Sequence, residues 1–452
     1  MRTIRLHDTR SAGPKTLEPR DPARVGIYAC GPTVYQPIHV GNARPYVVYT
    51  LLKRFLEHEG YAVTLVANVT DVNDKVYAAA EAAGVPSADL AREMTARYVA
   101  DTDRLALGRP DAEPLASETI GPIIELIETL LEAGHAYAAD GDVLFRVRSD
   151  PAYGSLSHRA IDDMDQGEGV EGAERKEDPL DFALWKAHKP GEDTAWDAPW
   201  GRGRPGWHIE CSAMAEELLG VDLDVHGGGN DLTFPHHENE AAQTRSARGA
   251  ELARIWMHNG MLQLGGEKMA KSVGNIESLA DALERWGRDA VLLLFSQAHY
   301  RQPMQYSDDT LGAAQAGVRR IREAGRQLRP GPSPEDMAPL RERFFAALAD
   351  DFNTAEALGA VWEWVRESNR RGGVGDADLR DMLGVLGLDN LLEAGAADGE
   401  PDEAARALLA QREQARANRD WAEADRLRDE LTALGWEVRD SPAGPELVPA
   451  ER

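Results

Sequence analysis

The chain has 452 residues, of which 42% are hydrophobic and 28% charged, as in an ordinary globular protein long enough for several domains. A formal charge of −27 is the opposite of the basic footprint of a general nucleic-acid binder, so a nucleic-acid partner would need local basic patches. Two distant cysteines argue against a disulfide framework, and we see neither a signal peptide nor a membrane helix, which predicts a cytoplasmic protein without a membrane partner.

The first clear pattern is a strand, a turn and a helix in residues 27–60. An apolar run carrying Cys30 leads into a turn that ends in His39, Val40, Gly41 and Asn42. Residues 43–60 then repeat apolar side chains at helical spacing, and residues 61–68 (YAVTLVAN) have the β-branched, apolar character of a buried strand. This order predicts a phosphate-binding unit, because a helix N-terminus offers unpaired N–H groups to an anion.

The pattern returns in the second half of the chain, after helices predicted at 75–106 and 120–133, a strand at 143–147 and a mobile acidic loop at 163–178. Residues 206–211 (GWHIEC) predict a strand, 213–219 a helix capped by Ser212, and 222–226 a strand. A glycine turn (227–229) and a helix beginning at Pro235 follow. Two such halves, separated by an insertion, predict a split α/β nucleotide-binding fold.

From about residue 277 onward the pattern is helical. Four arginines (319, 322, 326 and 329) share one predicted helix face, which could contact a phosphate backbone or simply face solvent. Helices are predicted over 337–386 with a cap-like start at 351–354, followed by a linker at 394–402. The last piece reads as a helical hairpin and a short strand, with one apolar stripe formed by Trp421, Ala424, Leu427, Leu431 and Leu434.

Potential metal ligands occur in the stretch PHHENE (235–240). His236 and Glu240 stand at i and i+4, side by side on a helix, with His237 as the second choice. Together with Cys30 and Cys211 they form a plausible zinc set of two sulfur, one nitrogen and one oxygen donors. The alternative, that both cysteines are small buried side chains and the histidines cap a helix, stays open on residue types alone.

Two further segments have the chemistry of nucleotide binding. Lys268 and Lys271 follow two glycines, and lysines in such a loop can stabilise charge that develops on a polyphosphate. Asn230 and Asp231 follow three glycines, which would let a nucleotide approach the backbone closely.

Taken together, seven ordered blocks resemble the cysteinyl-tRNA synthetase family of class I aminoacyl-tRNA synthetases, from near residue 1 to near residue 445. The blocks are CGPTVY…HVGN (30–42), NVTDVNDK (68–75), PLDFALWK (179–186), PGWHIECSAM (205–214), HGGGNDLTFPHHENE (226–240), KMAKS (268–272) and DFNTAEAL (351–358).

The resemblance implies ATP-dependent ligation of L-cysteine to tRNA(Cys) through cysteinyl-adenylate. It assigns catalysis to His39, Asn42, Lys268 and Lys271, of which His39, Asn42 and Lys271 bind ATP. It assigns substrate contacts to Thr70, Trp207 and Asp231. One zinc ion is assigned to Cys30, Cys211, His236 and Glu240. Mg²⁺ would accompany ATP, and we expect a monomer. Asn42 and Ala270 depart from the family's HIGH and KMSKS signatures, where His and Ser stand, but both lysines are kept.

The resemblance also implies a Rossmann-type parallel sheet split by a connective insertion, then an all-α bundle and a small C-terminal module. The expected boundaries are catalytic halves at 1–125 and 196–265, the insertion at 126–195, a KMSKS loop and stem-contact region at 266–320, an anticodon-binding bundle at 321–395, and the module at 400–452. A related alternative is a ligase that joins cysteine to an amino sugar, as in mycothiol synthesis; a second is a zinc- and RNA-binding protein that has lost catalysis.

Overall fold

The computed structural model describes residues 2–164, 173–264, 267–268, 277–393, 403–434, 436–441 and 444–449. The chain divides into two compact units, Met1–Asp389 and Asn390–Arg452. The finer domain boundaries stay predictions. Among the described residues, none of the helices combines the length and apolar character needed to cross a bilayer.

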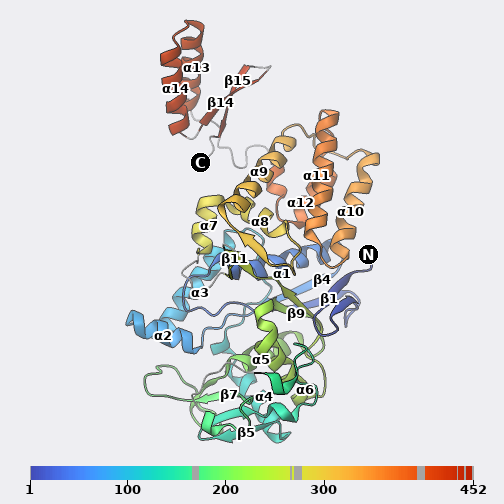
Figure 1. The fold of residues 1–452 in the computed structure, drawn as a ribbon, viewed down its shortest axis with the longest axis vertical. Helices are drawn as coiled ribbons and strands as arrows, with labels where there is room; N and C mark the ends of the chain where they lie inside the picture. The colour runs from blue at the N-terminus through green and yellow to red at the C-terminus, as the bar shows by residue number, and fades with distance from the viewer. Residues whose placement is uncertain are drawn as a thin grey trace. The chain divides into compact units, whose positions relative to one another are not determined.

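The centre of the first unit is a parallel sheet with the strand order β10-β9-β3-β4 (Figure 1). Its strands are β3 (Arg24–Ala29), β4 (Ala62–Ala67), β9 (Leu223–Gly229) and β10 (Ala253–Asn259). Helix α1 (Val40–His58) lies between β3 and β4 in the chain, and α6 (Glu238–Arg248) lies between β9 and β10, so both halves predicted from the sequence are present. The halves join where β3 pairs with β9, and the strand order reverses there. Open α/β sheets bind ligands at such a reversal, beside the carboxyl ends of the strands.

A second sheet is inserted between the two halves and is antiparallel, in the order β5-β6-β7-β8. Its strands are β5 (Ala136–Ala139), β6 (Asp142–Phe145), β7 (Phe182–Ala187) and β8 (Gly203–Pro205). Helix α4 (Ile120–Glu132), which the sequence predicted, shares one apolar core with this sheet, and the core includes Phe145, Phe182 and Trp185. The sheet extends to Pro205, past residue 195, where the insertion was expected to end.

Three short strands form a further sheet; in the described part of the chain two helices lie between its second and third strands, and four more helices follow the third strand (Figure 1). The strands, in the order β12-β11-β13, are β11 (Leu262–Leu264), β12 (Glu267–Lys268) and β13 (Met304–Tyr306). The helices are α7 (Leu279–Trp286), α8 (Arg288–Ser296), α9 (Asp308–Gly325), α10 (Ala338–Ala349), α11 (Thr354–Arg371) and α12 (Ala377–Val385). The predicted cap is confirmed, because the Asn353 side chain accepts a hydrogen bond from the Glu356 N–H at the start of α11. The N-terminus adds a hairpin of β1 (Arg5–Asp8) and β2 (Gly13–Thr16).

The second unit pairs α13 (Glu403–Ala417) and α14 (Trp421–Ala433), followed by the hairpin of β14 (Trp436–Ser441) and β15 (Gly444–Pro449). The middle of the predicted apolar stripe is buried: Ala424, Leu427 and Leu431. Its two ends are not, since Trp421 is 61% and Leu434 52% exposed. Of the predicted loops, residues 165–172 and all of 394–402 lie outside the described residues.

Three predicted elements are wrong in detail, and one of them is the helix over 75–106. It is two helices, α2 (Asp74–Ala83) and α3 (Ser87–Asp103). Gly84 ends α2 in the left-handed conformation with φ of +68°, and Pro86 then precedes α3 in an extended conformation. Glycine at a helix C-terminus and proline at the next start interrupt a helix that apolar periodicity alone would continue.

The second error is the strand predicted at 206–211, which is the first part of helix α5 (Trp207–Leu219). Cys211 therefore lies inside a helix and not at a strand end, and Ser212 does not cap it. Residues 208–215 are all buried. A helix that is covered on every side loses the alternation of apolar and polar residues by which a helix is recognised in a sequence.

The third error concerns the glycine run and the helix after it. Gly227, Gly228 and Gly229 extend strand β9 instead of forming a turn. A Cβ on Gly227 would lie 2.1 Å from both the Met257 carbonyl oxygen and the Tyr49 hydroxyl, so glycine is needed here for close packing. The α-helix begins at Glu238, because Phe234 is extended and residues 233–237 form a wider turn.

Candidate active site

The carboxyl ends of the parallel strands converge on Cys30, the residue that follows β3. Its N–H donates to the Gly227 carbonyl of β9 at 2.9 Å. The next N–H, of Gly31, donates to the side-chain oxygen of Asn68 at the end of β4, at 3.0 Å. The turn after β3 is thus held from both neighbouring strands, at the reversal of strand order where a ligand is expected.

Four buried side chains that could hold a metal ion meet beside this turn: Cys30, His236, His237 and Glu240, whose donor atoms all lie within 4.8 Å of one another. Glu240 Oε1 lies 3.1 Å from His236 Nε2 and 3.8 Å from Cys30 Sγ. His237 Nε2 lies 3.3 Å from Cys30 Sγ. The pair predicted at i and i+4 is therefore close in space, and His237, the second choice from the sequence, is also present.

Cys211, the fourth predicted ligand, borders this cluster from helix α5. Its Sγ lies 3.9 Å from Cys30 Sγ, and both thiols are buried. The hydrogen bond with the Cys30 thiol lowers the pKa of Cys211, whereas burial raises that of Cys30. Thiolate is the form in which cysteine binds a metal.

The donor set fits a cation such as Zn²⁺. Glu240 is fully buried, and within the described parts of the chain its ion-pair partners are His226, His236 and His237, with no lysine or arginine among them. A buried carboxylate without a cationic partner is costly. A metal ion among sulfur, imidazole and carboxylate donors would supply the missing positive charge.

Further histidines support this cluster, and the sequence analysis did not single them out. His208 and His236 face each other through their Nδ1 atoms at 2.9 Å, and His237 Nδ1 lies 2.7 Å from His258 Nε2. His226 Nε2 contacts the second Glu240 oxygen at 2.8 Å. Ring partners of this kind orient metal-binding histidines. His208, His226 and His258 come from separate elements, so spacing along the sequence could not have indicated them.

His39 and Asn42 form a capping box at the start of helix α1. The Asn42 N–H donates to His39 Nδ1 at 3.2 Å, and the His39 N–H donates to the Asn42 side-chain oxygen at 3.3 Å. The chain after the predicted lysine motif also reaches this segment, since the Val40 N–H donates to the Glu277 carbonyl and the Leu279 N–H to the Ile38 carbonyl. The positive end of the helix dipole at the start of α1 favours an anion such as a phosphate.

The two predicted lysines are only partly within the described structure. The backbone of Lys268 lies in β12, which pairs with β11, whereas Lys271 lies outside the described residues. Their assignment to ATP therefore stays a prediction.

The three predicted substrate residues come from different segments. Thr70 is buried after β4 and its hydroxyl accepts from the Asn68 side-chain amide at 3.2 Å. Trp207, at the start of α5, is 37% exposed and stacks on His236 with ring centres 4.3 Å apart. Asp231 is exposed and lies directly after β9. Trp207 is the one whose contact with the metal-binding cluster is direct.

This arrangement is that of a class I aminoacyl-tRNA synthetase, because residues 16–316 match the family model of the tRNA synthetases class I (C) catalytic domain. Residues 343–390 match the DALR domain, and residues 398–444 match the cysteinyl-tRNA ligase anticodon binding domain. The chain belongs to the cysteine--tRNA ligase family. It is 46% identical over 456 residues to cysteine--tRNA ligase of Alkalilimnicola ehrlichii and 44% identical over 455 residues to that of Halorhodospira halophila, covering 98% of each chain.

Solved structures agree on the fold. Methionyl-tRNA synthetase of Mycobacterium tuberculosis in complex with methionyl-adenylate is 19% identical, with a TM-score of 0.61 over 82% of this chain and 89% of the other. The predicted fold class and the predicted enzyme, a class I cysteine--tRNA ligase, are therefore confirmed.

Proposed function

We propose that the chain joins L-cysteine to tRNA(Cys) in two steps at this site. The observation that supports it most is the buried cluster of thiols, imidazoles and a carboxylate around Cys30, nine residues before the capped start of helix α1. One side of the turn suits a sulfur-containing side chain and the other suits a phosphate. Monomeric state and cytoplasmic location stay predictions from the sequence.

The zinc ligands in this proposal are Cys30, Cys211, His236 and Glu240, with His237 as the alternative fourth donor. When bound, the ion supplies a coordination site that prefers the cysteine thiolate to the serine hydroxyl. A pocket that merely fitted the side chain would discriminate by only ~1–3 kcal/mol. Selection through the metal would therefore make a separate editing domain unnecessary.

In the first step the cysteine carboxylate attacks the α-phosphate of ATP, forming cysteinyl-adenylate and releasing pyrophosphate. His39, Asn42 and the helix N-terminus would stabilise the negative charge that develops on the phosphate. Lys268 and Lys271 would approach the phosphates from the other side, and Mg²⁺ would enter with ATP. Thr70, Trp207 and Asp231 would hold the amino acid so that its carboxylate faces the phosphate.

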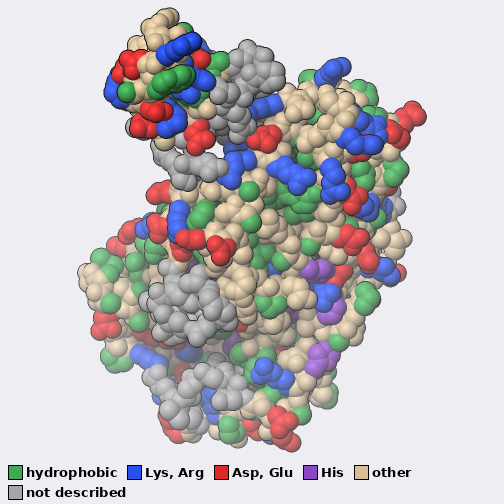
Figure 2. All heavy atoms as spheres, turned by 45° about the horizontal axis from the view of Figure 1, so that its top comes forward, with side chains coloured by type: hydrophobic (Ala, Val, Ile, Leu, Met, Phe, Trp, Pro, Cys, Tyr) green, Lys and Arg blue, Asp and Glu red, His purple; other side chains and the backbone are tan. Residues whose placement is uncertain are grey.

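In the second step a hydroxyl of the terminal ribose of tRNA attacks the carbonyl carbon of the adenylate, and AMP leaves. The match of residues 398–444 to an anticodon binding domain supports a tRNA acceptor over an amino sugar. The face of the molecule drawn in Figure 2 mixes Lys and Arg with Asp and Glu. Because the net charge is −27, contact with RNA would depend on Lys and Arg side chains gathered at the contact itself.

The test combines metal analysis with two activity measurements on the purified chain. We expect about one Zn²⁺ per chain, ATP–pyrophosphate exchange that depends on cysteine, and cysteine-dependent charging of tRNA(Cys). Exchange with transfer to a glucosaminyl acceptor and not to tRNA would favour the amino-sugar ligase. Absence of exchange in a zinc-loaded chain would refute the proposal.

A further inference from the structure

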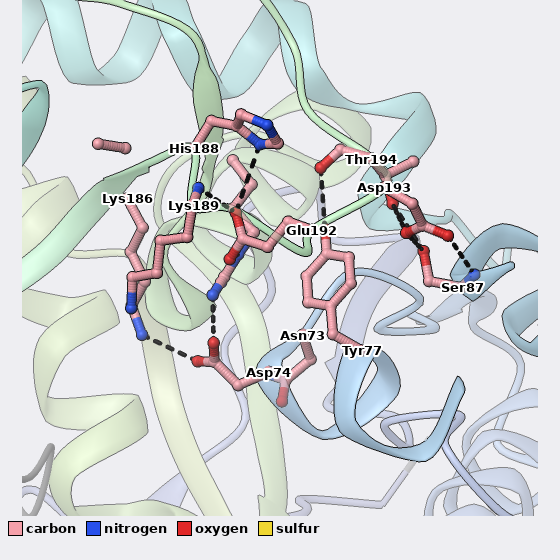
Figure 3. A network of polar contacts seen from close by, with 12 residues as sticks. Asn73, Asp74, Tyr77, Ser87, Lys186, His188, Lys189, Glu192, Asp193 and Thr194 are labelled. Carbon is pink, nitrogen blue, oxygen red and sulfur yellow. Dashed lines mark hydrogen bonds and ion pairs between the residues drawn. The ribbon is translucent and has the colours of Figure 1, made fainter. Parts of the chain in front are cut away.

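A network of ion pairs joins the inserted antiparallel sheet to helix α2 (Figure 3). Asp74, the first residue of α2, receives Lys186 Nζ at 3.0 Å and is also bound by the Arg204 guanidinium. Lys186 and Arg204 lie opposite each other on β7 and β8. One carboxylate therefore holds two neighbouring strands of the insertion.

Arg204 is the buried centre of this network, with only 2% of its side chain exposed. Its Nε donates to Glu192 Oε1 at 3.0 Å, and its guanidinium carbon lies 5.2 Å from the centre of the Tyr77 ring on α2. Burial alone would lower the pKa of Arg204, but Asp74 and Glu192 raise it, so the guanidinium stays charged. Two acids and one aromatic ring thus fix a cation between the insertion and α2.

The ion pair between Asp74 and Arg204, called the bridge below, lies close in sequence to two of the predicted substrate residues. Asp74 follows Thr70 by four residues, and Arg204 precedes Trp207 by three. Thr70 is paired to Thr33 by a β-bridge, and the next residue, Asp71, accepts a hydrogen bond from the Ser117 N–H at 3.0 Å, so the segment before α2 is anchored. On the other side, a Cβ on Gly206 would lie 2.0 Å from the Ala183 carbonyl oxygen, so the link from Arg204 to Trp207 is packed tightly against β7.

The two segments also approach each other at the pocket. The Ala116 N–H donates to the Val69 carbonyl at 3.3 Å, and Ala116 lies in one apolar core with Cys211 and Met214 of α5. The residue before Thr70 is thus attached to the element that packs against α5. The segment that carries Thr70 and the segment that carries Trp207 are therefore joined at one end by packing and a few residues away by the ion pair between Asp74 and Arg204. This fixes the distance between the two segments.

We propose that Asp74 and Arg204 are positioning residues for the amino-acid pocket, because their bridge sets the distance between Thr70 and Trp207. The inference rests on the proposed function, in which Thr70 and Trp207 contact cysteine. The ATP site, at the start of α1, lies outside the bridged segments. Loosening the bridge should therefore weaken the binding of cysteine and leave that of ATP unchanged.

The test is Asp74→Ala, which frees the insertion from α2 while Arg204 keeps Glu192 and Asn73 still caps α2. We expect KM for cysteine in ATP–pyrophosphate exchange to rise about 10-fold or more, with KM for ATP nearly unchanged. Asp74→Glu, which keeps the carboxylate, should restore part of the loss. If Asp74→Ala does not fold, Asp74→Asn takes its place, because the amide oxygen can still accept one hydrogen bond.

The matched control is Asp193→Ala in the adjoining loop. Asp193 accepts from the Ser87 N–H at 2.7 Å and from its hydroxyl, so it attaches the same insertion to α3 (Figure 3) but is remote in sequence from Thr70 and Trp207. We expect normal KM values for both substrates. An unchanged KM for cysteine in Asp74→Ala, a parallel rise in KM for ATP, or the same effect in Asp193→Ala would overturn the inference. Absence of exchange in the wild-type chain would instead refute the proposed function, and this inference with it.

Discussion

Arg44 should be the most sensitive single residue of helix α1, and Arg44→Met tests this. Its side chain is almost fully buried, at 1% exposed, and it has no carboxylate partner among the described residues. The guanidinium instead donates to five carbonyl oxygens, those of Gly260 (2.6 Å), Met261 (3.4 Å), His299 (3.4 Å), Tyr300 (3.2 Å) and Gln302 (2.8 Å). Burial lowers the pKa of Arg44 to about 10, which leaves it charged at neutral pH.

The expected loss in the free energy of unfolding depends on which carbonyl oxygens are left without a hydrogen-bond donor in Arg44→Met. Four of the five accept a second hydrogen bond, for example Tyr300 from the Gly260 N–H at 2.8 Å. Gln302 has no second donor among the described residues. A hydrogen bond to a charged group contributes ~1.5–3 kcal/mol, and the two short ones, to Gly260 and Gln302, dominate. Relief from burying a charge offsets part of this, so we expect Arg44→Met to lower the free energy of unfolding by about 3 kcal/mol.

Urea unfolding followed by tryptophan fluorescence measures this loss as a lower midpoint, compared between variants because a chain of this size need not unfold in two states. Arg54→Met is the matched control: Arg54 lies on the same helix and also donates to a carbonyl, that of Gly384, but it is only partly buried. We expect a loss of about 1 kcal/mol there. Arg44→Lys should fall between, since one ammonium cannot span both carbonyl segments. Equal midpoints for Arg44→Met and the wild type would refute the reasoning.

Three further predictions concern the turn, a charged junction and the metal. Gly31→Ala should abolish cysteine-dependent exchange, since its Cβ would lie 1.7 Å from the Asn68 carbonyl oxygen; a fully active variant would contradict this. Asp351 has its pKa lowered to about 2, because hydrogen bonds from His299, the His7 N–H and Tyr300 outweigh burial. Asp351→Asn should therefore lower the free energy of unfolding by about 1 kcal/mol after solvent screening. This difference from the wild type is complete above about pH 4 and shrinks as the pH falls toward about 2. Urea midpoints measure it, and a difference that grows in acid would count against the prediction. Removal of the metal with a chelator should lower the melting temperature, and added Zn²⁺ should restore it, with a weaker recovery in Cys211→Ser; identical melting curves before and after chelation would exclude a bound structural ion.

Several features of this protein depend only on residues that are close together in the sequence, and the sequence alone determines them. Apolar spacing places Val47, Leu51 and Phe55 on one buried face of α1, and Gly60 adopts the positive φ expected after the helix. His39 and Asn42 cap that helix through contacts three residues apart. The i, i+4 spacing of His236 and Glu240 likewise brings them together. These features depend on neighbours within one turn, so the sequence suffices to predict them.

Only the tertiary structure decided the features that depend on distant neighbours. Residues 206–211 are helical although their pattern resembled a strand, because burial on all sides removes the periodicity. The three glycines continue a strand, since Met257 and Tyr49 leave no room for a Cβ. Cys30 and Cys211 meet across 181 residues of chain, and the Arg204 bridge joins the inserted sheet to helix α2. Packing between segments far apart in the sequence fixes these contacts, and no local propensity encodes it.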